Sequence, residues 1–269
     1  MPSVHRDFNI IKAYFLLILI ILWTLFSLLL YSFLTLIPFF NQRVYIPFYH
    51  RVSCRIMGIR IVQKGDISTH GSTLYVSNHV SYLDISLLGS LIKAGFVAKS
   101  EIASWPLINH LARIQNSIFI ERKTSKAKAQ IAILRERLTA GQSLILFPEG
   151  TSTNGAEVLP LKSSLFLAAD TNDAEKEVYI QPLSVVYTQH NGKGMDQGLR
   201  DNFAWYADFP FGAHFFKMLG MGTITAVVSF SKPIRFDDFS NRKDCTAACE
   251  EMMRTSFEKA FAESGSIKP

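Results

Sequence analysis

The sequence has little cysteine. Its three cysteines, Cys54, Cys245 and Cys249, form an odd and sparse set, which excludes the disulfide framework of a small secreted domain. Cys245 and Cys249 are four residues apart and would share one face of a helix, as half of a metal site would, but no other Cys or His lies near them in the sequence. We therefore expect packing roles for them, in a chain that faces a reducing compartment.

Several patterns that mark other protein classes are also missing. The chain has no zinc knuckle and no arginine-rich tail, which argues against nucleic acid as a partner. It has no Gly-x-Ser-x-Gly elbow that would present a hydrolase serine. Internal repeats and low-complexity segments are absent as well. The 269 residues are enough for one sizeable globular domain with an additional element.

Charge is absent between Ala13 and Phe40. As a helix this run would extend about 42 Å, whereas a bilayer core needs about 20 residues. The run is longer than a signal-peptide core and no small-residue cleavage site follows it. A buried helix of a soluble protein would rarely lack a polar face over such a length. Two membrane interpretations remain: a single span that ends near Pro38, and a helical hairpin that enters one leaflet and returns.

Positive residues lie on both sides of this apolar run, and more of them follow it than precede it. The flanking residues are Arg6 and Lys12 before the run, and Arg43, Arg51, Arg55 and Arg60 after it. By the positive-inside rule, the globular part should face the cytoplasm. We accordingly divide the chain into residues 1–60, a membrane anchor with a basic connector, and residues 61–269, a globular domain.

The rest of the chain alternates short apolar runs with helical patterns. Strands are predicted at Thr73–Val76, Phe96–Lys99, Ser117–Ile120, Ser143–Phe147, Val178–Tyr187 and Ile224–Phe230. Helices are predicted at Lys123–Ala140 and Cys245–Ala262. This alternation predicts an α/β fold in which a central, mostly β-sheet layer is flanked by helices.

His79 and Asp84 are the clearest candidates for chemistry. They lie five residues apart, directly after the strand predicted at Thr73–Val76. In a continuous helix their side chains would point about 140° apart, so they can meet only if His79 lies in the turn and Asp84 near the helix start. Imidazole is the side chain best suited to take a proton from a hydroxyl at neutral pH, and a carboxylate on its other nitrogen fixes the tautomer. A capping role for both residues is the structural alternative.

Three further blocks accompany this pair. Phe147–Thr151 reads Phe-Pro-Glu-Gly-Thr at the end of an apolar strand, which is either a plain turn or a loop that presents backbone amides and a hydroxyl beside a carboxylate. Arg122 follows the strand predicted at Ser117–Ile120, and Pro182 lies inside the strand predicted at Val178–Tyr187. A proline inside a strand marks an edge or a bend.

Four blocks follow one another along this chain. They are Asn-His-x-Ser-x-x-Asp, the block around Arg122, Phe-Pro-Glu-Gly-Thr and the block around Pro182, and their order and spacing are informative. Together they resemble the glycerolphosphate acyltransferase superfamily, and more narrowly the 1-acylglycerol-3-phosphate acyltransferases, from about Gly71 to Pro233. The resemblance implies O-acylation of a lysophospholipid to phosphatidic acid at the cytoplasmic face of a bacterial inner membrane. It implies membrane lipids as partners, an acyl-CoA or acyl carrier protein thioester as donor, and no cofactor or metal.

The resemblance also implies roles for single residues. His79 would be the general base on the acceptor hydroxyl, and that hydroxyl would attack the donor directly, without an acyl-enzyme. Asp84 would orient His79 and stabilise its charge. The residues implied at the substrate site are Asn78, Ser81, Arg122 (on the acceptor phosphate), Glu149, Gly150, Thr151, Lys162 and Pro182.

The chain departs from the family pattern near the acceptor. Asn116 stands near the place of a family glycine, and Ser152 follows Phe-Pro-Glu-Gly-Thr where many members carry arginine. Lys162 matches a family lysine and could supply charge instead. The run Ala204-Trp205-Tyr206-Ala207-Asp208 looks like a bacterial subgroup that includes lyso-ornithine lipid acyltransferases, which makes a lyso-ornithine lipid, or another lysolipid, the alternative acceptor.

The segment from Arg113 to Arg137 holds seven Lys or Arg against two Glu, a local net charge of +5 within a chain total of +6. It is either a solvated helix face or a contact with an anionic surface, such as leaflet phosphates, the phosphates of CoA or an acidic carrier protein. Two other functions stay open from the sequence: a serine lipid hydrolase that uses Ser81 or another serine, and a membrane-binding protein without catalysis.

Overall fold

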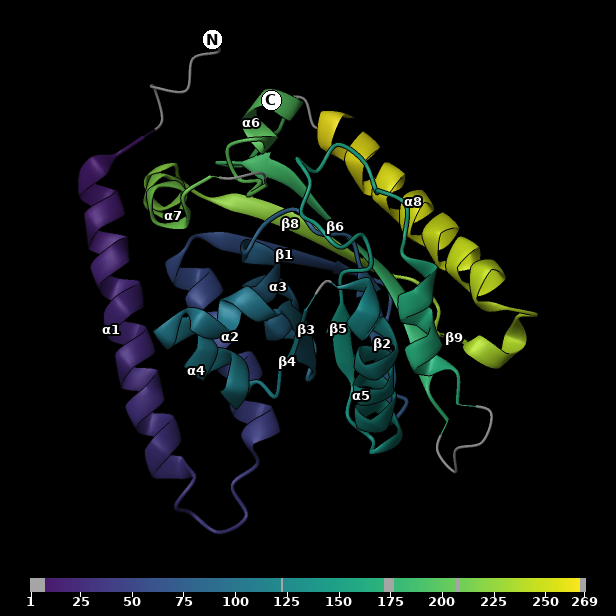
Figure 1. Cartoon of the computed structure of the whole chain (residues 1–269). Coiled ribbons are helices and arrows are strands. Elements are labelled where there is room, and N and C mark those ends of the chain that lie inside the picture. Colours follow the sequence, from purple (N-terminus) through teal and green to yellow (C-terminus); the bar gives the residue numbers. More distant parts are fainter. Residues whose placement is uncertain (1–7, 122, 172–176, 207–208, 267–269) are drawn as a thin grey trace.

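A mixed β-sheet forms the centre of the molecule in a computed structural model that describes residues 8–121, 123–171, 177–206 and 209–266 (Figure 1). The strands are β1 (Ile59–Lys64), β2 (Thr73–Ser77), β3 (Gly95–Lys99), β4 (Ile118–Ile120), β5 (Leu144–Leu146), β6 (Tyr179–His190), β7 (Lys193–Gly194), β8 (Ile224–Phe230) and β9 (Ile234–Arg235). Their order is β1-β8-β6-β2-β5-β3-β4, with β7 and β9 paired to β6. All six strands predicted from the sequence are present, and β1, β7 and β9 are additional.

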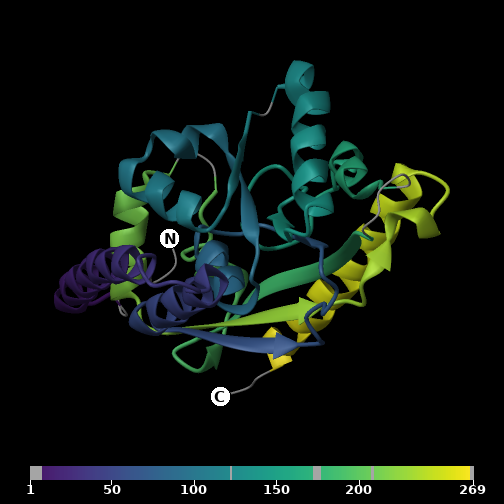
Figure 2. The ribbon, with the colours of Figure 1, turned by 90° about the horizontal axis from the view of Figure 1, so that it is seen from below.

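Helices lie on both sides of the twisted sheet (Figure 2). They are α1 (Ile10–Leu34), α2 (Gln42–Ile56), α3 (Leu83–Leu91), α4 (Pro106–Ile114), α5 (Ala127–Thr139), α6 (Gln197–Arg200), α7 (Phe211–Gly220) and α8 (Arg242–Ser266). Short 3₁₀ helices are η1 (Ser100–Ser104), η2 (Thr124–Lys126), η3 (Ser163–Ala169) and η4 (Phe236–Asp238). The predicted α/β class is therefore confirmed. The predicted division at residue 60 stays a prediction, and β1 runs across that point.

The strand directions bring several loops to one edge of the sheet. β2 pairs in parallel with both β5 and β6, β5 pairs in parallel with β3, and β3 with β4. β8 is antiparallel to β6. The carboxyl ends of β2, β3, β4 and β5 therefore meet at one edge, and the loops that follow them lie close together.

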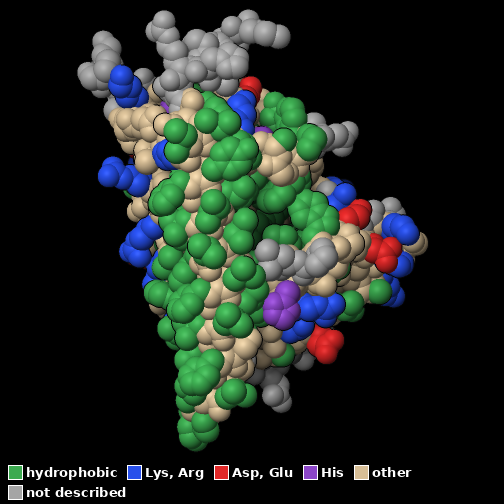
Figure 3. All heavy atoms as spheres, turned by 90° about the vertical axis from the view of Figure 1, so that its left-hand side faces the viewer, with side chains coloured by type: hydrophobic (Ala, Val, Ile, Leu, Met, Phe, Trp, Pro, Cys, Tyr) green, Lys and Arg blue, Asp and Glu red, His purple; other side chains and the backbone are tan. Residues whose placement is uncertain are grey.

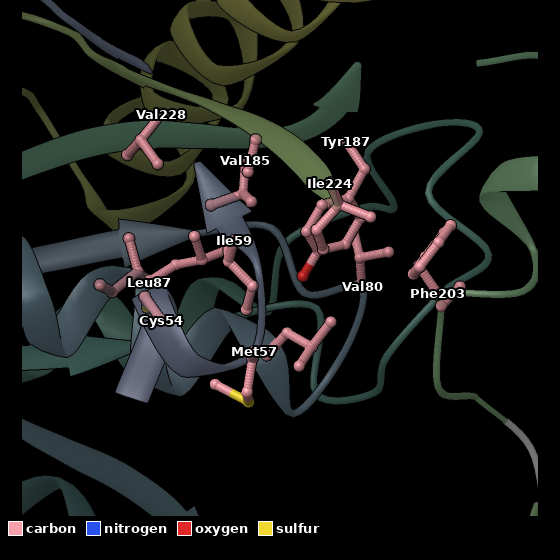
Figure 4. Packing of buried hydrophobic residues seen from close by; sticks show 14 of the residues in the cluster. Cys54, Met57, Ile59, Val80, Leu87, Val185, Tyr187, Phe203, Ile224 and Val228 are labelled. Atoms are coloured by element: carbon pink, nitrogen blue, oxygen red, sulfur yellow. The ribbon is translucent and has the colours of Figure 1, made fainter. Parts of the chain in front are cut away.

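Two hydrophobic clusters cover the two faces of the sheet, because successive side chains of a strand point to opposite faces. In β2, Tyr75 belongs to the cluster beneath α2 and α3, whereas Leu74 and Val76 belong to the cluster beneath α5 and α8. Cys54 packs in the first cluster, and Cys245 and Cys249 pack in the second. Figure 4 shows part of the first cluster, where the hydroxyl of Tyr187 points toward the segment that holds Val80.

Most of the uncharged run near the N-terminus, up to Leu34, is one continuous helix. α1 ends at Leu34, and the helix that returns along it is α2, which lies beyond the run. α1 and α2 together form a helical hairpin whose second arm lies beyond the uncharged run, and the choice between a single span and a leaflet hairpin stays a prediction. In length and composition α1 passes the criteria for a membrane span.

The packing of α1 places two of its hydroxyl groups inside the protein. Its buried residues are Ala13, Thr24 and Ser27. The Thr24 hydroxyl lies 3.1 Å from the Tyr49 hydroxyl of α2, and the Ser27 hydroxyl lies 2.6 Å from that of Tyr45. Its large apolar side chains instead face outward, and Figure 3 shows them covering the helix on this side of the molecule. α1 thus buries hydroxyl groups and exposes apolar side chains, whereas a helix on a surface in contact with water does the reverse.

Candidate active site

His79 and Asp84 lie at the carboxyl edge of the sheet. β2 ends at Ser77, His79 is in the turn that follows, and Asp84 is the second residue of α3. The Nδ1 atom of His79 lies 2.8 Å from Oδ2 of Asp84. The structure therefore has the arrangement that helix geometry requires for this spacing, with the histidine in the turn and the carboxylate at the helix start.

The Asp84 carboxylate is fully buried and surrounded by donors. Besides His79, its Oδ2 accepts hydrogen bonds from the backbone N–H of Val80 at 2.8 Å and of Ser81 at 2.9 Å. Its Oδ1 accepts from the hydroxyl of Tyr187 at 2.7 Å. Burial and the negative charge of Asp84 raise the pKa of Tyr187 far above its ordinary value, so this phenol stays protonated and donates. These four donors compensate the cost of burying the charge.

This hydrogen bonding determines what His79 can do. Asp84 accepts the Nδ1–H, so Nε2 of the neutral ring keeps its lone pair. The ring stacks on Phe147 with centroids 4.1 Å apart, and 18% of the side chain is exposed. Nε2 is therefore available to a hydroxyl in the adjoining cavity. This geometry is that of a general base that is oriented by a carboxylate.

Glu149 lies behind the histidine and connects two loops. Its Oε2 accepts the backbone N–H of His79 at 3.0 Å, and its Oε1 accepts that of Leu159 at 2.9 Å. Burial raises its pKa to about 7, with a smaller increase from the charge of Asp84, and the two backbone hydrogen bonds oppose the shift. With both oxygens bonded to the backbone, Glu149 positions His79. Its predicted contact with the acceptor stays a prediction.

The raised pKa of Glu149 predicts a stability change with pH. Its pKa is about 7 in the folded protein and about 4.5 in the unfolded chain. Between these values the folded state binds the extra proton, so this group makes the protein less stable as pH rises from about 4.5 to 7. The full effect is about 3 kcal/mol. Thermal unfolding in detergent at a series of pH values should give a steeper fall in Tm for the wild type than for Glu149→Gln. Equal slopes would contradict the assignment.

Gly150 and Lys162 lie together at the rim of the cavity. Gly150 has a φ of +75°, a left-handed conformation that suits glycine, and a Cβ there would collide with the ammonium end of Lys162. Both residues line the cavity. Thr151 is exposed, and its hydroxyl donates to the carbonyl oxygen of Ser152 at 3.3 Å. Of the predicted acceptor residues in this loop, Gly150 and Lys162 therefore reach the cavity wall.

Three other predicted residues have different outcomes. The Asn78 side chain bridges to β6, donating to the carbonyl oxygen of Val185 at 3.0 Å and accepting its N–H at 2.7 Å. The Ser81 hydroxyl is buried and has no hydrogen-bond partner among the described residues. Arg122 lies outside the described residues, between Glu121 and Lys123, which both line the cavity.

Pro182 lies in a central strand. Its carbonyl oxygen accepts the N–H of Ser231, so its nitrogen side faces the break between β8 and β9. A residue without an N–H is tolerated there because no ladder hydrogen bond is lost. The expectation of a bend or edge is thus met at an interruption of the neighbouring strand, while the predicted pocket-shaping role stays a prediction.

A cavity of about 660 Å³ extends from His79 between α1, α2 and α4. Most of its wall is apolar, including Leu17 and Tyr31 of α1, and cationic side chains of Lys99, Lys123 and Lys162 lie elsewhere on its lining. Figure 3 shows a hollow lined by hydrophobic side chains beside α1. The cavity has room for an acyl chain and places it beside the base. Its α1 wall was not foreseen from the sequence, because only the packing of α1 against the domain creates it.

The site is thus a carboxylate-oriented histidine beside an apolar cavity, an arrangement suited to an enzyme that activates a hydroxyl. A family model described as Acyltransferase matches residues 58–186. A lyso-ornithine lipid O-acyltransferase of Rhodobacter capsulatus is 40% identical over 78% of this chain and 74% of its own length. That of Rhizobium meliloti is 34% identical over 77% and 72%. A 1-acyl-sn-glycerol-3-phosphate acyltransferase of Neisseria gonorrhoeae is 29% identical over 58% of each chain.

The fold has a solved counterpart. The crystal structure of the 1-acyl-sn-glycerophosphate acyltransferase of Thermotoga maritima matches with a TM-score of 0.63 and 21% identity, over 90% of this chain and 95% of that one. With these relatives, the chain belongs to the glycerolphosphate acyltransferase family, as the sequence motifs predicted. It is an acyltransferase of lysolipids.

Proposed function

We propose that the enzyme transfers an acyl chain from acyl-CoA or acyl carrier protein to the free hydroxyl of a lyso-ornithine lipid. The observation that carries this proposal is the similarity to lyso-ornithine lipid O-acyltransferases, which extends over about three quarters of both chains. Ser152, in the place where many family members carry an arginine, supports an acceptor without a phosphate. The sequence motifs alone favoured 1-acylglycerol-3-phosphate, and this acceptor stays the second candidate through the more distant relatives.

The proposed reaction uses the His79–Asp84 pair directly. Nε2 of His79 takes the proton of the acceptor hydroxyl while the hydroxyl oxygen attacks the thioester carbonyl carbon. Asp84, 2.8 Å from Nδ1, stabilises the imidazolium that forms. When the carbon–sulfur bond breaks, the proton passes from Nε2 to the thiolate that leaves. The products are the O-acylated lipid and the free thiol of CoA or the carrier protein.

The exposed face of α1 supports a place at the membrane. Ile11 is 78% exposed and Leu29 is 73% exposed, although both are large and apolar. Such a surface is stable when lipid covers it. Because α1 packs on α2 and α7, we place it along the lipid surface, with the globular part on the cytoplasmic face of the inner membrane. The cavity would then open where both lipid acceptor and acyl chain are present.

The acceptor can be identified by a panel of substrates. Purified enzyme in detergent micelles should acylate lyso-ornithine lipid with a kcat/KM at least about tenfold above that for 1-acylglycerol-3-phosphate, a difference of about 1.4 kcal/mol in transition-state binding. Both acceptors are tested with acyl-CoA and with acyl carrier protein, and product is measured by mass spectrometry. A preference for the phosphate acceptor would replace the proposed function by the second candidate.

A further inference from the structure

Aromatic side chains from three separate segments meet beside the catalytic turn. Tyr82 precedes α3, Trp105 precedes α4, and Trp205 and Phe211 lie in and after the loop that leads to α7. Tyr82 contacts Trp205 at 5.8 Å and Phe211 at 5.0 Å between ring centroids, and Trp105 contacts Phe211 at 5.4 Å. All four line the cavity that holds His79. We call these four residues the aromatic cluster.

The aromatic cluster is fixed to the catalytic turn. The backbone N–H of Trp205 donates to the carbonyl oxygen of Val80 at 2.9 Å, and Val80 directly follows His79. The ring of Trp205 is oriented by a hydrogen bond from its Nε1 to the carbonyl oxygen of Phe209 at 2.9 Å. A group of the acceptor that binds at this cluster therefore lies near the hydroxyl that His79 must reach.

Two of the three polar side-chain atoms of the cluster are engaged within the protein. The indole N–H of Trp205 is bonded to its own loop, and the Tyr82 hydroxyl lies 3.0 Å from Nδ1 of His214. The surface that these rings present to a ligand is therefore mainly their π-systems. Aromatic faces attract cations through the ring quadrupole, and tryptophan does so most strongly.

The charges around the cavity separate into different places. The cationic lining residues Lys99, Lys123 and Lys162 belong to segments other than the aromatic cluster, and they suit carboxylate or phosphate groups. Among the described lining residues the only carboxylate is that of Glu121, which is engaged by Lys123 and Lys126. A ligand cation in this cavity would thus find its most suitable partner in the aromatic cluster.

We propose that the aromatic cluster is the subsite for the cationic amine of the acceptor headgroup, which it binds by cation–π contact chiefly through Trp205. The inference rests on the proposed function, because ornithine carries a side-chain amine whereas a glycerol phosphate headgroup carries none. It assigns to the segment around Trp205 a part in selecting the acceptor.

Two acceptors and two substitutions of Trp205 test the proposal. The acceptors are lyso-ornithine lipid and the same lipid with its side-chain amine acetylated, which keeps the chains and the reacting hydroxyl but removes the charge. In the wild type, acetylation should raise KM about 10-fold, within the range of about 2- to 30-fold expected for a cation–π contact. Trp205→Leu should raise KM for the amine acceptor by a similar factor and leave KM for the acetylated acceptor unchanged. Trp205→Phe should keep part of the discrimination.

Phe216→Leu is the matched control. Phe216 lies on α7 with its ring against Phe8 and Tyr14 and does not line the cavity, so this substitution should leave the ratio of the two KM values as in the wild type. If Trp205→Leu raises KM equally for both acceptors, the cluster is an apolar wall and the inference is wrong. The same holds if the wild type does not distinguish the acceptors, a comparison that needs no variant to fold. If the wild type acylates only 1-acylglycerol-3-phosphate, the proposed function fails and the inference falls with it.

Discussion

Replacing His79 with alanine is expected to lower kcat for acyl transfer by about 10²- to 10⁴-fold, the usual contribution of a positioned general base. The reason is that Nε2 of His79 is the one proton acceptor placed by a buried carboxylate beside the cavity in the described part of the chain. The measurement is transfer of a labelled acyl chain to the acceptor under saturating conditions. Circular dichroism and the Tm of the variant show whether the fold survives.

Ser81→Ala is a useful companion because it separates the transferase from the hydrolase interpretation. The Ser81 hydroxyl is buried and is not part of the cavity lining, so its loss should leave kcat within a few-fold of the wild type. A serine hydrolase would lose activity in this variant and would show an initial burst of acyl-enzyme in the wild type. Full activity of His79→Ala would rule out the general-base mechanism, and full cellular function of that variant would favour a binding protein without catalysis.

The sequence predicted the contact between His79 and Asp84 because its geometry is local. A turn followed by a helix is encoded by Asn78, Ser81 and the apolar residues beyond them, and the resulting contact spans five residues. The partner of Asp84 on its other oxygen could not be predicted in this way. Tyr187 is 103 residues away, and only the parallel pairing of β2 with β6 brings it near.

The same limit explains why the partner of Asn78 and the missing elements could not be predicted from the sequence. Asn78 carries an amide in a catalytic motif, yet its partner is the backbone of Val185, at a separation of 107 residues. α2 was not predicted for two reasons. Pro47 lies inside it, and the contacts of its Tyr45 and Tyr49 are with α1, which only the tertiary packing brings near. Local pattern thus gives the strands and the base, and tertiary packing decides which polar residues face the cavity.

The position of α1 connects the membrane with the reaction. One face of this helix is exposed and apolar, and another face forms part of the cavity wall. A lipid that leaves the bilayer beside α1 would meet the cavity within the width of a helix, about 10 Å. The anchor is therefore expected to contribute to substrate binding as well as to location.

Replacing Asp84 with asparagine is expected to lower kcat by about 10³- to 10⁴-fold, because it removes the negative charge that stabilises the imidazolium of His79. An asparagine can place its oxygen where Oδ2 accepts from His79, Val80 and Ser81, and its amide toward the Tyr187 hydroxyl. The turn can thus keep its shape, while the imidazolium formed during attack is no longer stabilised by a negative charge. The measurement is kcat together with Tm.

Two other substitutions separate charge from packing at the same position. Asp84→Ala leaves the buried donors of Val80, Ser81 and Tyr187 without an acceptor, at about 1–3 kcal/mol each, so it should lower Tm well below that of Asp84→Asn. Tyr187→Phe removes one neutral donor and keeps the charge, and we expect a loss in kcat of only about tenfold. If Asp84→Asn were no slower than Tyr187→Phe, the carboxylate would act on the shape of the turn alone. A loss in kcat for Asp84→Asn at least a hundred times larger than that for Tyr187→Phe, at similar Tm, would instead show that the carboxylate acts through its charge on the protonated histidine.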